Sequence, residues 1–179
     1  MKNKIMIKVL SLEDLKDTFL SNFNRYQVTD QVLFKENNQY KLKPDHFIDD
    51  WDGDKKALVI HDLRTCIREG GKVIGAFEGE ILAGFANIES CMFGSKVEYI
   101  ELPYIHISSE LRGYGIGKKL FEKCCEEGKR LGAAKLYIAA HPSVASQGFY
   151  SAMGCREAVE INEKIMSREP LDIQLEKVL

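Results

Sequence analysis

Two kinds of hydrophobic pattern alternate along this chain, and together they predict its elements. Short runs of apolar or alternating residues predict strands, whereas apolar residues that recur every three or four positions predict helices. Glycine and asparagine separate many of these segments, as expected at helix ends and tight turns. The predicted strands span residues 5–10, 28–35, 39–43, 72–77, 81–88, 98–107, 135–140, 156–159 and 171–178, and the predicted helices span residues 11–23, 54–70, 116–131 and 143–153, with a helical turn at 162–168.

The order of these elements predicts one α/β domain over residues 1–179. Strands and helices are mixed along the chain, which favours a sheet with helices packed on both of its faces. With 179 residues, 45% of them hydrophobic, the chain is long enough to bury one sizeable core. Residues 24–54 are the least regular part. Asn37 and Asn38 favour a tight hairpin there, because asparagine tolerates a positive φ.

The residues that follow the strand at 98–107 form a glycine-rich turn. A polar segment at 108–111 leads to the run Arg-Gly-Tyr-Gly-Ile-Gly at 112–117, where the next helix begins. Glycines allow the backbone to approach a ligand closely, and the free amides of a helix N-terminus attract an anion. The spacing fits neither a Walker loop, which needs Gly-Lys-Ser/Thr, nor the Gly-x-Gly-x-x-Gly of dinucleotide sites. The sequence therefore predicts a phosphate-binding turn, with an ordinary tight turn as the alternative.

Charge and cysteine content argue against several classes of function. The formal net charge is −2 and the pI is about 6.1, which gives no electrostatic basis for binding nucleic acid or an anionic membrane surface. No apolar run in the sequence is long enough to span a bilayer. The five cysteines show no Cys-x-x-Cys spacing and are odd in number. This favours reduced thiols in a cytoplasmic protein over disulfides or a metal site.

Two motifs in the second half of the chain resemble those of the GNAT superfamily of acyl-CoA-dependent N-acyltransferases. Arg112, Gly115 and Gly117 match the Arg/Gln-x-x-Gly-x-Gly/Ala pattern of its pyrophosphate loop. Residues 149–154, Phe-Tyr-Ser-Ala-Met-Gly, resemble its Tyr-x-x-x-Gly-Phe segment at the expected distance, although Cys155 replaces the usual phenylalanine. The order of predicted elements is also similar to that fold over essentially the whole chain.

The resemblance implies a fold and a cofactor site. The fold is a mixed, mostly antiparallel central sheet of about six or seven strands, with helices on both faces and a splayed central strand. Pro103 is compatible with the splay, because proline removes one ladder donor. Acetyl-CoA is the implied cosubstrate, with its pantetheine arm along an open strand edge and its pyrophosphate on the turn. The implied cofactor-binding residues are Ile105, His106, Ile107, Arg112, Gly113, Tyr114, Gly115, Ile116, Gly117, Lys118 and Ser143, the last at a position where many members have asparagine.

The resemblance also suggests groups for the two proton transfers. Tyr150 is the implied general acid, because a tyrosine with a reference pKa of about 10 stays protonated above a thiol of about 8.5. Glu101 is the leading candidate for the general base. Strict alternation along the strand places Glu101 on the same face as Ile105, where apolar neighbours would raise the pKa of its carboxyl. His106, His141 and a water molecule are the alternative bases.

Together these features predict an N-acetyltransferase that moves an acetyl group from acetyl-CoA directly to a primary amine, without a metal and without a covalent enzyme intermediate. The resemblance implies that the acceptor, expected to be a small molecule, is held by residues 24–54 and the loop around Phe93. The acidic cluster around Trp51 either attracts this cation or forms a solvated loop. The alternatives are acetylation of a protein or peptide amine, and a non-catalytic acyl-CoA sensor with no need for Tyr150 or Glu101. A homodimer is compatible with the sequence.

Overall fold

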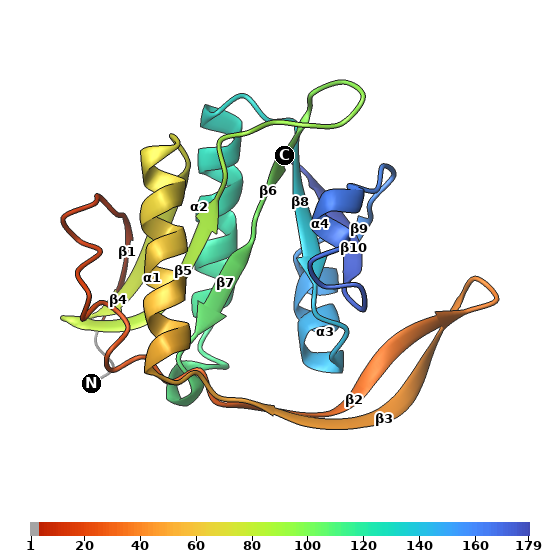
Figure 1. Ribbon diagram of the computed structural model, residues 1–179, viewed down its shortest axis with the longest axis horizontal. Helices are drawn as coiled ribbons and strands as arrows, with labels where there is room; N and C mark the ends of the chain where they lie inside the picture. Colours follow the sequence, from red (N-terminus) through yellow and green to blue (C-terminus); the bar gives the residue numbers. More distant parts are fainter. Residues whose placement is uncertain (1–3) are drawn as a thin grey trace.

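The computed structural model describes residues 4–179 and contains two four-stranded sheets side by side (Figure 1). The first sheet has the order β1 (Ile5–Val9), β4 (Lys72–Glu78), β5 (Ile81–Ile88) and β7 (Tyr104–Ile107), with antiparallel pairing throughout. The second has the order β6 (Tyr99–Glu101), β8 (Lys135–Ala140), β10 (Ile173–Val178) and β9 (Arg156–Glu157), in which β6 and β8 are parallel and the other pairs antiparallel. The predicted mixed, mostly antiparallel architecture is confirmed.

Helices cover both faces of the first sheet, because its strands direct apolar side chains alternately to each side. α1 (Gly53–Arg68) lies on the face that carries Val73 and Phe85, and α2 (Ile116–Arg130) lies on the opposite face, which carries Ile74. The remaining helical segments are α3 (Val144–Ala152), α4 (Glu163–Met166) and the short 3-10 helix Ser109–Leu111. Among residues 4–179, no helix is both long and apolar enough to cross a membrane.

The two sheets separate at a break in the strand that the sequence predicts as continuous over residues 98–107. β6 and β7 are the two halves of this strand, and Leu102 and Pro103 lie between them. Leu102 N still donates to Tyr137 O of β8 at 2.9 Å, whereas beyond Pro103 the chain pairs with β5 instead. Because proline has no N–H, the ladder to β8 ends there. The splayed central strand is therefore confirmed.

A long two-stranded arm, β2 (Gln27–Glu36) and β3 (Gln39–Asp49), runs across the end of the molecule at which β7 and β8 finish (Figure 1). Its turn is Asn37-Asn38, with φ of 50° and 64°, as predicted for a tight hairpin. Leu33 N donates to Pro142 O at 2.8 Å, just before α3. The arm thus leads into α1 at one end, and β2 is hydrogen-bonded to the segment between β8 and α3.

The predicted helix over residues 11–23 is wrong. The segment forms successive turns with hydrogen bonds between residues three apart, such as Leu15 N to Leu12 O at 3.2 Å and Phe23 N to Leu20 O at 3.1 Å. The residues that it buries fully are Leu15, Leu20 and Phe23. Positions five apart lie about 140° away from each other around an α-helix, so Leu15 and Leu20 cannot share one helical face. Successive turns bury both.

Gly84 tests how closely β5 and β7 must approach. A β-carbon at this position would lie 2.6 Å from Ile107 Cδ1 and 2.8 Å from His106 O, which is closer than such atoms pack. We expect Gly84→Ala to lower the free energy of unfolding by about 1–3 kcal/mol, because β7 has to move. Gly53→Ala is the control, since its added carbon meets nothing within 4 Å. Equal midpoints for the two variants in chemical denaturation would contradict the prediction.

Candidate active site

The open edge of β7 is the first feature of the site. Ser108 N donates to Ala83 O of β5 at 2.9 Å. Main-chain groups alternate along an antiparallel strand, so His106 also directs its N–H and C=O toward β5. Ile105 and Ile107 therefore direct theirs toward the gap between β7 and β8, where the ladder has ended. An extended ligand can pair with such an edge as an added strand.

The glycine-rich turn begins where this edge ends. Gly113 and Gly115 have φ of 81° and 76°, a backbone region that other residues adopt only with strain. A β-carbon would meet nothing within 4 Å at either position, so the backbone conformation, not packing, requires glycine. Lys119 N makes the first α-helical bond, to Gly115 O at 3.3 Å. The amides of residues 116–118 precede it and have no intrahelical acceptor, which suits them to an anion.

Arg112 holds this turn against β7. Its Nε donates to Ile107 O at 3.2 Å, and partial burial lowers the pKa of the guanidinium. The side chain therefore fixes the turn and also places a positive charge beside the helix start. Tyr114 and Lys118 are exposed on the same turn, and Lys118 Nζ lies 3.8 Å from a carboxylate oxygen of Glu122.

Ser143 lies across from the turn, but its hydroxyl is already used. It is the buried N-cap of α3, where Oγ accepts the Ser146 amide at 3.3 Å and donates to Ser146 Oγ at 3.0 Å. Its main-chain N donates to His141 Nδ1 at 3.1 Å. A serine at this position is a favourable N-cap, because its hydroxyl satisfies a free amide of the first helical turn. This use of the hydroxyl weakens the case for a CoA contact through the side chain.

Tyr150 lies on α3 with a buried side chain. It is 8% exposed and packs against the rings of Phe121 and Phe149. Among residues 4–179, no group hydrogen-bonds to its hydroxyl. Burial raises the pKa of Tyr150, so the hydroxyl stays protonated at neutral pH. A protonated hydroxyl without an internal partner, at the tip of an otherwise buried side chain, has the properties of a general acid.

Strict alternation predicts that Glu101 and Ile105 share a face of the strand. The structure places them on opposite faces, so that part of the prediction is wrong. Ile100 and Leu102 flank Glu101 and pack in the same core cluster as Ile105, so the Glu101 side chain lies on the other face. Its Oε1 pairs there with Arg168 Nη2 at 2.5 Å. The break after Leu102 shifts the alternation by one residue, as a bulge does. Burial raises the pKa of the Glu101 carboxyl, although Arg168 opposes this.

A second carboxylate lies beside Glu101. Glu89 follows β5, and its main-chain N donates to Glu101 O at 2.9 Å, while its Oε1 accepts Asn87 Nδ2 at 3.0 Å. Burial and the negative charge of Glu101 raise the pKa of Glu89. Neighbouring carboxylates of this kind hold a proton more tightly, which makes the pair a candidate proton acceptor. No sequence motif marks Glu89, because only the approach of β5 to the broken strand brings it here.

His106 lies on the α1 side of the sheet among aromatic and cationic groups. Its ring centroid is 4.9 Å from that of Trp51 and 5.7 Å from that of Phe85, and the Arg25 guanidinium lies 5.7 Å above Trp51. Burial, followed by the positive charges of Arg25 and Arg112, holds the pKa of His106 well below its ordinary value. The imidazole is therefore neutral at pH 7, but its lowered pKa makes it a weak proton acceptor.

The acidic cluster around Trp51 is largely used within the chain. Asp49 Oδ2 lies 3.6 Å from Arg25 Nη2, and Asp52 Oδ1 caps α1 by accepting a main-chain amide at 2.8 Å. The helix thus begins at Gly53, one residue before the predicted start, with Asp52 as its cap. Since Arg25 already covers Trp51, the cluster is better explained as a structural loop and cap than as an amine site.

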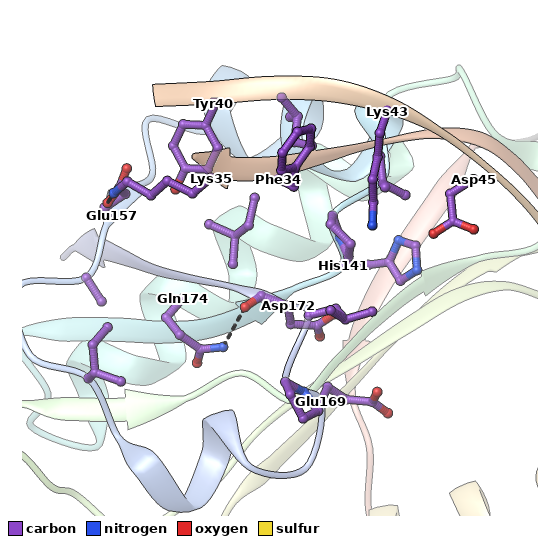
Figure 2. A pocket seen from close by; sticks show the side chains of 18 of the residues that line it. Phe34, Lys35, Tyr40, Lys43, Asp45, His141, Glu157, Glu169, Asp172 and Gln174 are labelled. Atoms are coloured by element: carbon purple, nitrogen blue, oxygen red, sulfur yellow. Dashed lines mark hydrogen bonds and ion pairs between the residues drawn. The ribbon is translucent and has the colours of Figure 1, made fainter. Parts of the chain in front are cut away.

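Two pockets flank the arm at the open end of the gap. The inner pocket, about 700 Å³, lies between β2, the glycine-rich turn and the start of α3. The outer pocket, about 500 Å³, lies between the arm and the segments around β8 and β10 (Figure 2). The inner pocket is lined by residues 26–31, Ser109, Arg112 and residues 143–145.

The outer pocket is lined by charged and aromatic side chains. Figure 2 shows Phe34, Tyr40 and Lys43 of the arm on one side and Asp172 and Gln174 on the other. Lys35 Nζ pairs with Glu157 Oε2 at 2.7 Å, so these two charges offset each other. The remaining charged groups are Asp45, Glu169, Asp172 and Lys43, and burial lowers the pKa of His141, which is neutral at pH 7. The pocket is therefore net negative.

A comparison with known protein families matches residues 23–155 to the acetyltransferase (GNAT) family. The chain belongs to the GNAT acetyltransferase family. The order of strands, the splay and the glycine-rich turn agree with the fold that the sequence motifs imply. As a member of this family, the protein is an acetyltransferase with acetyl-CoA as its cosubstrate.

Solved structures share the fold of this GNAT acetyltransferase at low sequence identity. Nourseothricin acetyltransferase has a TM-score of 0.69 and 14% identity, with 97% of this chain and 98% of that chain covered. A protein assigned as a streptothricin acetyltransferase from Bacillus anthracis str. Ames, in complex with acetyl-CoA, has a TM-score of 0.71 and 14% identity, with 98% and 99% covered. An aminoglycoside 6′-N-acetyltransferase complexed with CoA has a TM-score of 0.54 and 15% identity, with 70% and 80% covered. A comparison with curated protein sequences gives no match.

The residues of this GNAT acetyltransferase fit the cofactor. The open edge at Ile105 and Ile107 can pair with an amide-containing arm, and the amides of residues 116–118 suit a pyrophosphate. No side chain intrudes on Gly113 or Gly115. Bound acetyl-CoA would supply the thioester that carries the acetyl group to be transferred.

Four of the five cysteines of this GNAT acetyltransferase are poor nucleophiles. Burial raises the pKa of Cys66 and Cys155 to about 12, and it also raises the pKa of Cys124 and Cys125. The thiolate is the reactive form, so a raised pKa suppresses covalent chemistry. Within residues 4–179, no group of three or more His, Cys, Asp or Glu side chains is placed to hold a metal ion.

Gly115 tests the anion-binding turn. We expect Gly115→Ala to weaken CoA binding about tenfold, because a strained φ displaces amides that contact a charged group. Gly132→Ala is the matched control, since Gly132 also has a positive φ (91°) and open space but lies at the far end of α2. Both variants should lose a similar free energy of unfolding. Equal CoA dissociation constants for the two variants, measured by calorimetry, would contradict the proposed turn.

Proposed function

We propose that this protein transfers an acetyl group from acetyl-CoA to a primary amine of a small molecule that carries more than one positive charge. One observation carries the choice of acceptor: the net-negative outer pocket, which the arm and the segments around β8 and β10 enclose. Opposite charge favours capture of a cationic amine. The structural similarity to acetyltransferases that are named for nourseothricin, streptothricin and aminoglycosides supports a small-molecule acceptor.

In this proposal, the arm is the part of residues 24–54 that contacts the acceptor. It contributes Tyr40, Lys43 and Asp45 to the outer pocket, while His141 stands at the end of β8 beside it. The rings of Phe47 and His141 are 5.2 Å apart, so the arm closes over this end of the gap. A pocket of about 500 Å³ has the size of a small-molecule site.

The proton transfers are assigned to Tyr150 and to the carboxylate pair Glu101 and Glu89. The Ile107 N–H faces the gap, where it can donate to a carbonyl oxygen on which negative charge develops. Tyr150 holds a proton for the departing sulfur, supported by its burial and raised pKa. The carboxylate pair accepts the amine proton, directly or through water, and neutral His106 is the alternative acceptor.

Thiol release from acetyl-CoA in the presence of a panel of amines tests the proposed function. Polyamines and aminoglycoside-like compounds should support turnover, whereas a peptide with a free N-terminus should not. A peptide as the best acceptor would contradict the small-molecule assignment. CoA binding without turnover on any amine would favour the non-catalytic sensor.

Tyr150→Phe removes the proposed acid and keeps the ring. We expect kcat to fall at least about 100-fold, because the leaving thiolate then lacks a proton donor. The dissociation constant of acetyl-CoA should stay within about twofold of the wild-type value, since the packing against Phe121 and Phe149 is retained. Unchanged kcat at all pH values would exclude Tyr150 as the acid.

Asp172→Asn tests the charge of the outer pocket. Burial, followed by the charge of Glu169, raises the pKa of Asp172 to about 6. The charged form of Asp172 therefore lowers the stability of the fold above pH 6. This penalty disappears below about pH 4, where the carboxyl is protonated in both the folded and the unfolded chain. The variant should gain about 1 kcal/mol of stability at pH 8 and none at pH 4. The gain at pH 8 is small because water screens the charge of the half-exposed carboxyl.

The same variant should raise KM for a cationic amine about fivefold at pH 8, since one attractive charge is lost. For the wild type, KM should rise as the pH falls through 6, where Asp172 takes up its proton. Asp17→Asn, at an exposed site remote from both pockets, is the control. A stability gain with unchanged KM would remove Asp172 from the acceptor site.

A further inference from the structure

Two buried polar atoms have no partner, and they lie four residues apart. Among residues 4–179, the buried side-chain nitrogen and oxygen atoms without a hydrogen bond are Arg25 Nε and Thr29 Oγ1. Buried polar groups are nearly always paired, because leaving one unpaired costs free energy. Their concentration in the segment that crosses the gap points to a ligand that is absent from the apo fold.

Thr29 lines the inner pocket although it is only 3% exposed. It pairs with Phe47 in the arm, and the two side chains lie on the face of the hairpin that meets His141. Rotation about its Cα–Cβ bond moves the hydroxyl between staggered positions without moving the strand. A ligand in the inner pocket is thus within reach of the hydroxyl.

The charge of the inner pocket identifies the kind of ligand. Arg112 lines the inner pocket, and Arg25 is close enough that, in addition to burial, the charge of Arg112 lowers the pKa of Arg25. Asp30 also lines the pocket, but its Oδ1 lies 2.6 Å from His46 Nδ1 and so has a partner already. A cationic amine is disfavoured beside two arginines, whereas neutral amides and phosphate groups are accepted.

We propose that the Thr29 hydroxyl of the β2–β3 arm hydrogen-bonds the pantetheine chain of acetyl-CoA in the inner pocket. This inference rests on the use of acetyl-CoA in the proposed function. The pantetheine chain carries amides and a hydroxyl that a threonine can meet as donor or acceptor. Arg25 Nε lies in the same segment but Arg25 does not line the inner pocket, so the proposal concerns the Thr29 hydroxyl alone. The arm then contributes to both substrates, with the donor against Thr29 and the acceptor in the outer pocket.

Thr29→Val separates this role from a purely structural one, because it replaces the hydroxyl by a methyl group of similar size. The apo variant should have a Tm about 3 °C higher than the wild type, since a buried unpaired polar group is removed. Its affinity for CoA, measured by calorimetry, should fall about fivefold. Its affinity for adenosine 3′,5′-bisphosphate, which lacks pantetheine, should be unchanged. Thr29→Ser should restore CoA binding to within about twofold, and Thr65→Val on α1 should change neither affinity.

Other results would overturn the proposal in distinguishable ways. A higher Tm with unchanged CoA affinity would show that the hydroxyl is merely buried. Equal weakening of CoA and of the bisphosphate would place the contact on the nucleotide instead. A raised KM for the amine, with CoA affinity retained, would place Thr29 in the acceptor site. Absence of CoA binding by the wild type would reject the proposed function itself.

Discussion

The loss of one main-chain donor at Pro103 is the constraint on which the site depends. Proline cannot continue the ladder from β6 to β8, so the strand changes partner and continues as β7 beside β5. The two sheets part at that point, and the main-chain groups of Ile105 and Ile107 remain directed into the gap. The glycine-rich turn follows directly at the end of β7, which places the amides of residues 116–118, the proposed anion-binding groups, at the mouth of the same gap.

The arm divides the open end of this gap into two electrostatic environments. On the inner side, Arg112 and nearby Arg25 favour phosphates and neutral amides. On the outer side, Asp172 and its neighbours favour a cation. If the acceptor is the cationic amine that we propose, a separation of charge across one hairpin allows it and the anionic cofactor to bind without competing for the same site.

Several groups in the site are held in states that weaken the fold. Burial raises the pKa of Asp172 and of Glu101, so their charged forms are disfavoured in the folded state. Thr29 and Arg25 carry buried atoms without partners. Local sequence rules fail most often at such functional sites, because binding or catalysis requires groups that the folded chain does not satisfy by itself.

The sequence alone determined most of the elements, the glycine-rich turn and the position of Tyr150, because hydrophobic period, glycine and capping residues act locally. It could not determine the face of Glu101, since a one-residue shift at Pro103 reverses the alternation. It also misplaced a helix at residues 11–23 and had no signal for Glu89 or Thr29. These features were decided by tertiary structure, because they arise from contacts between strands and an arm that are distant in the chain, and no local pattern records which partners a strand will meet.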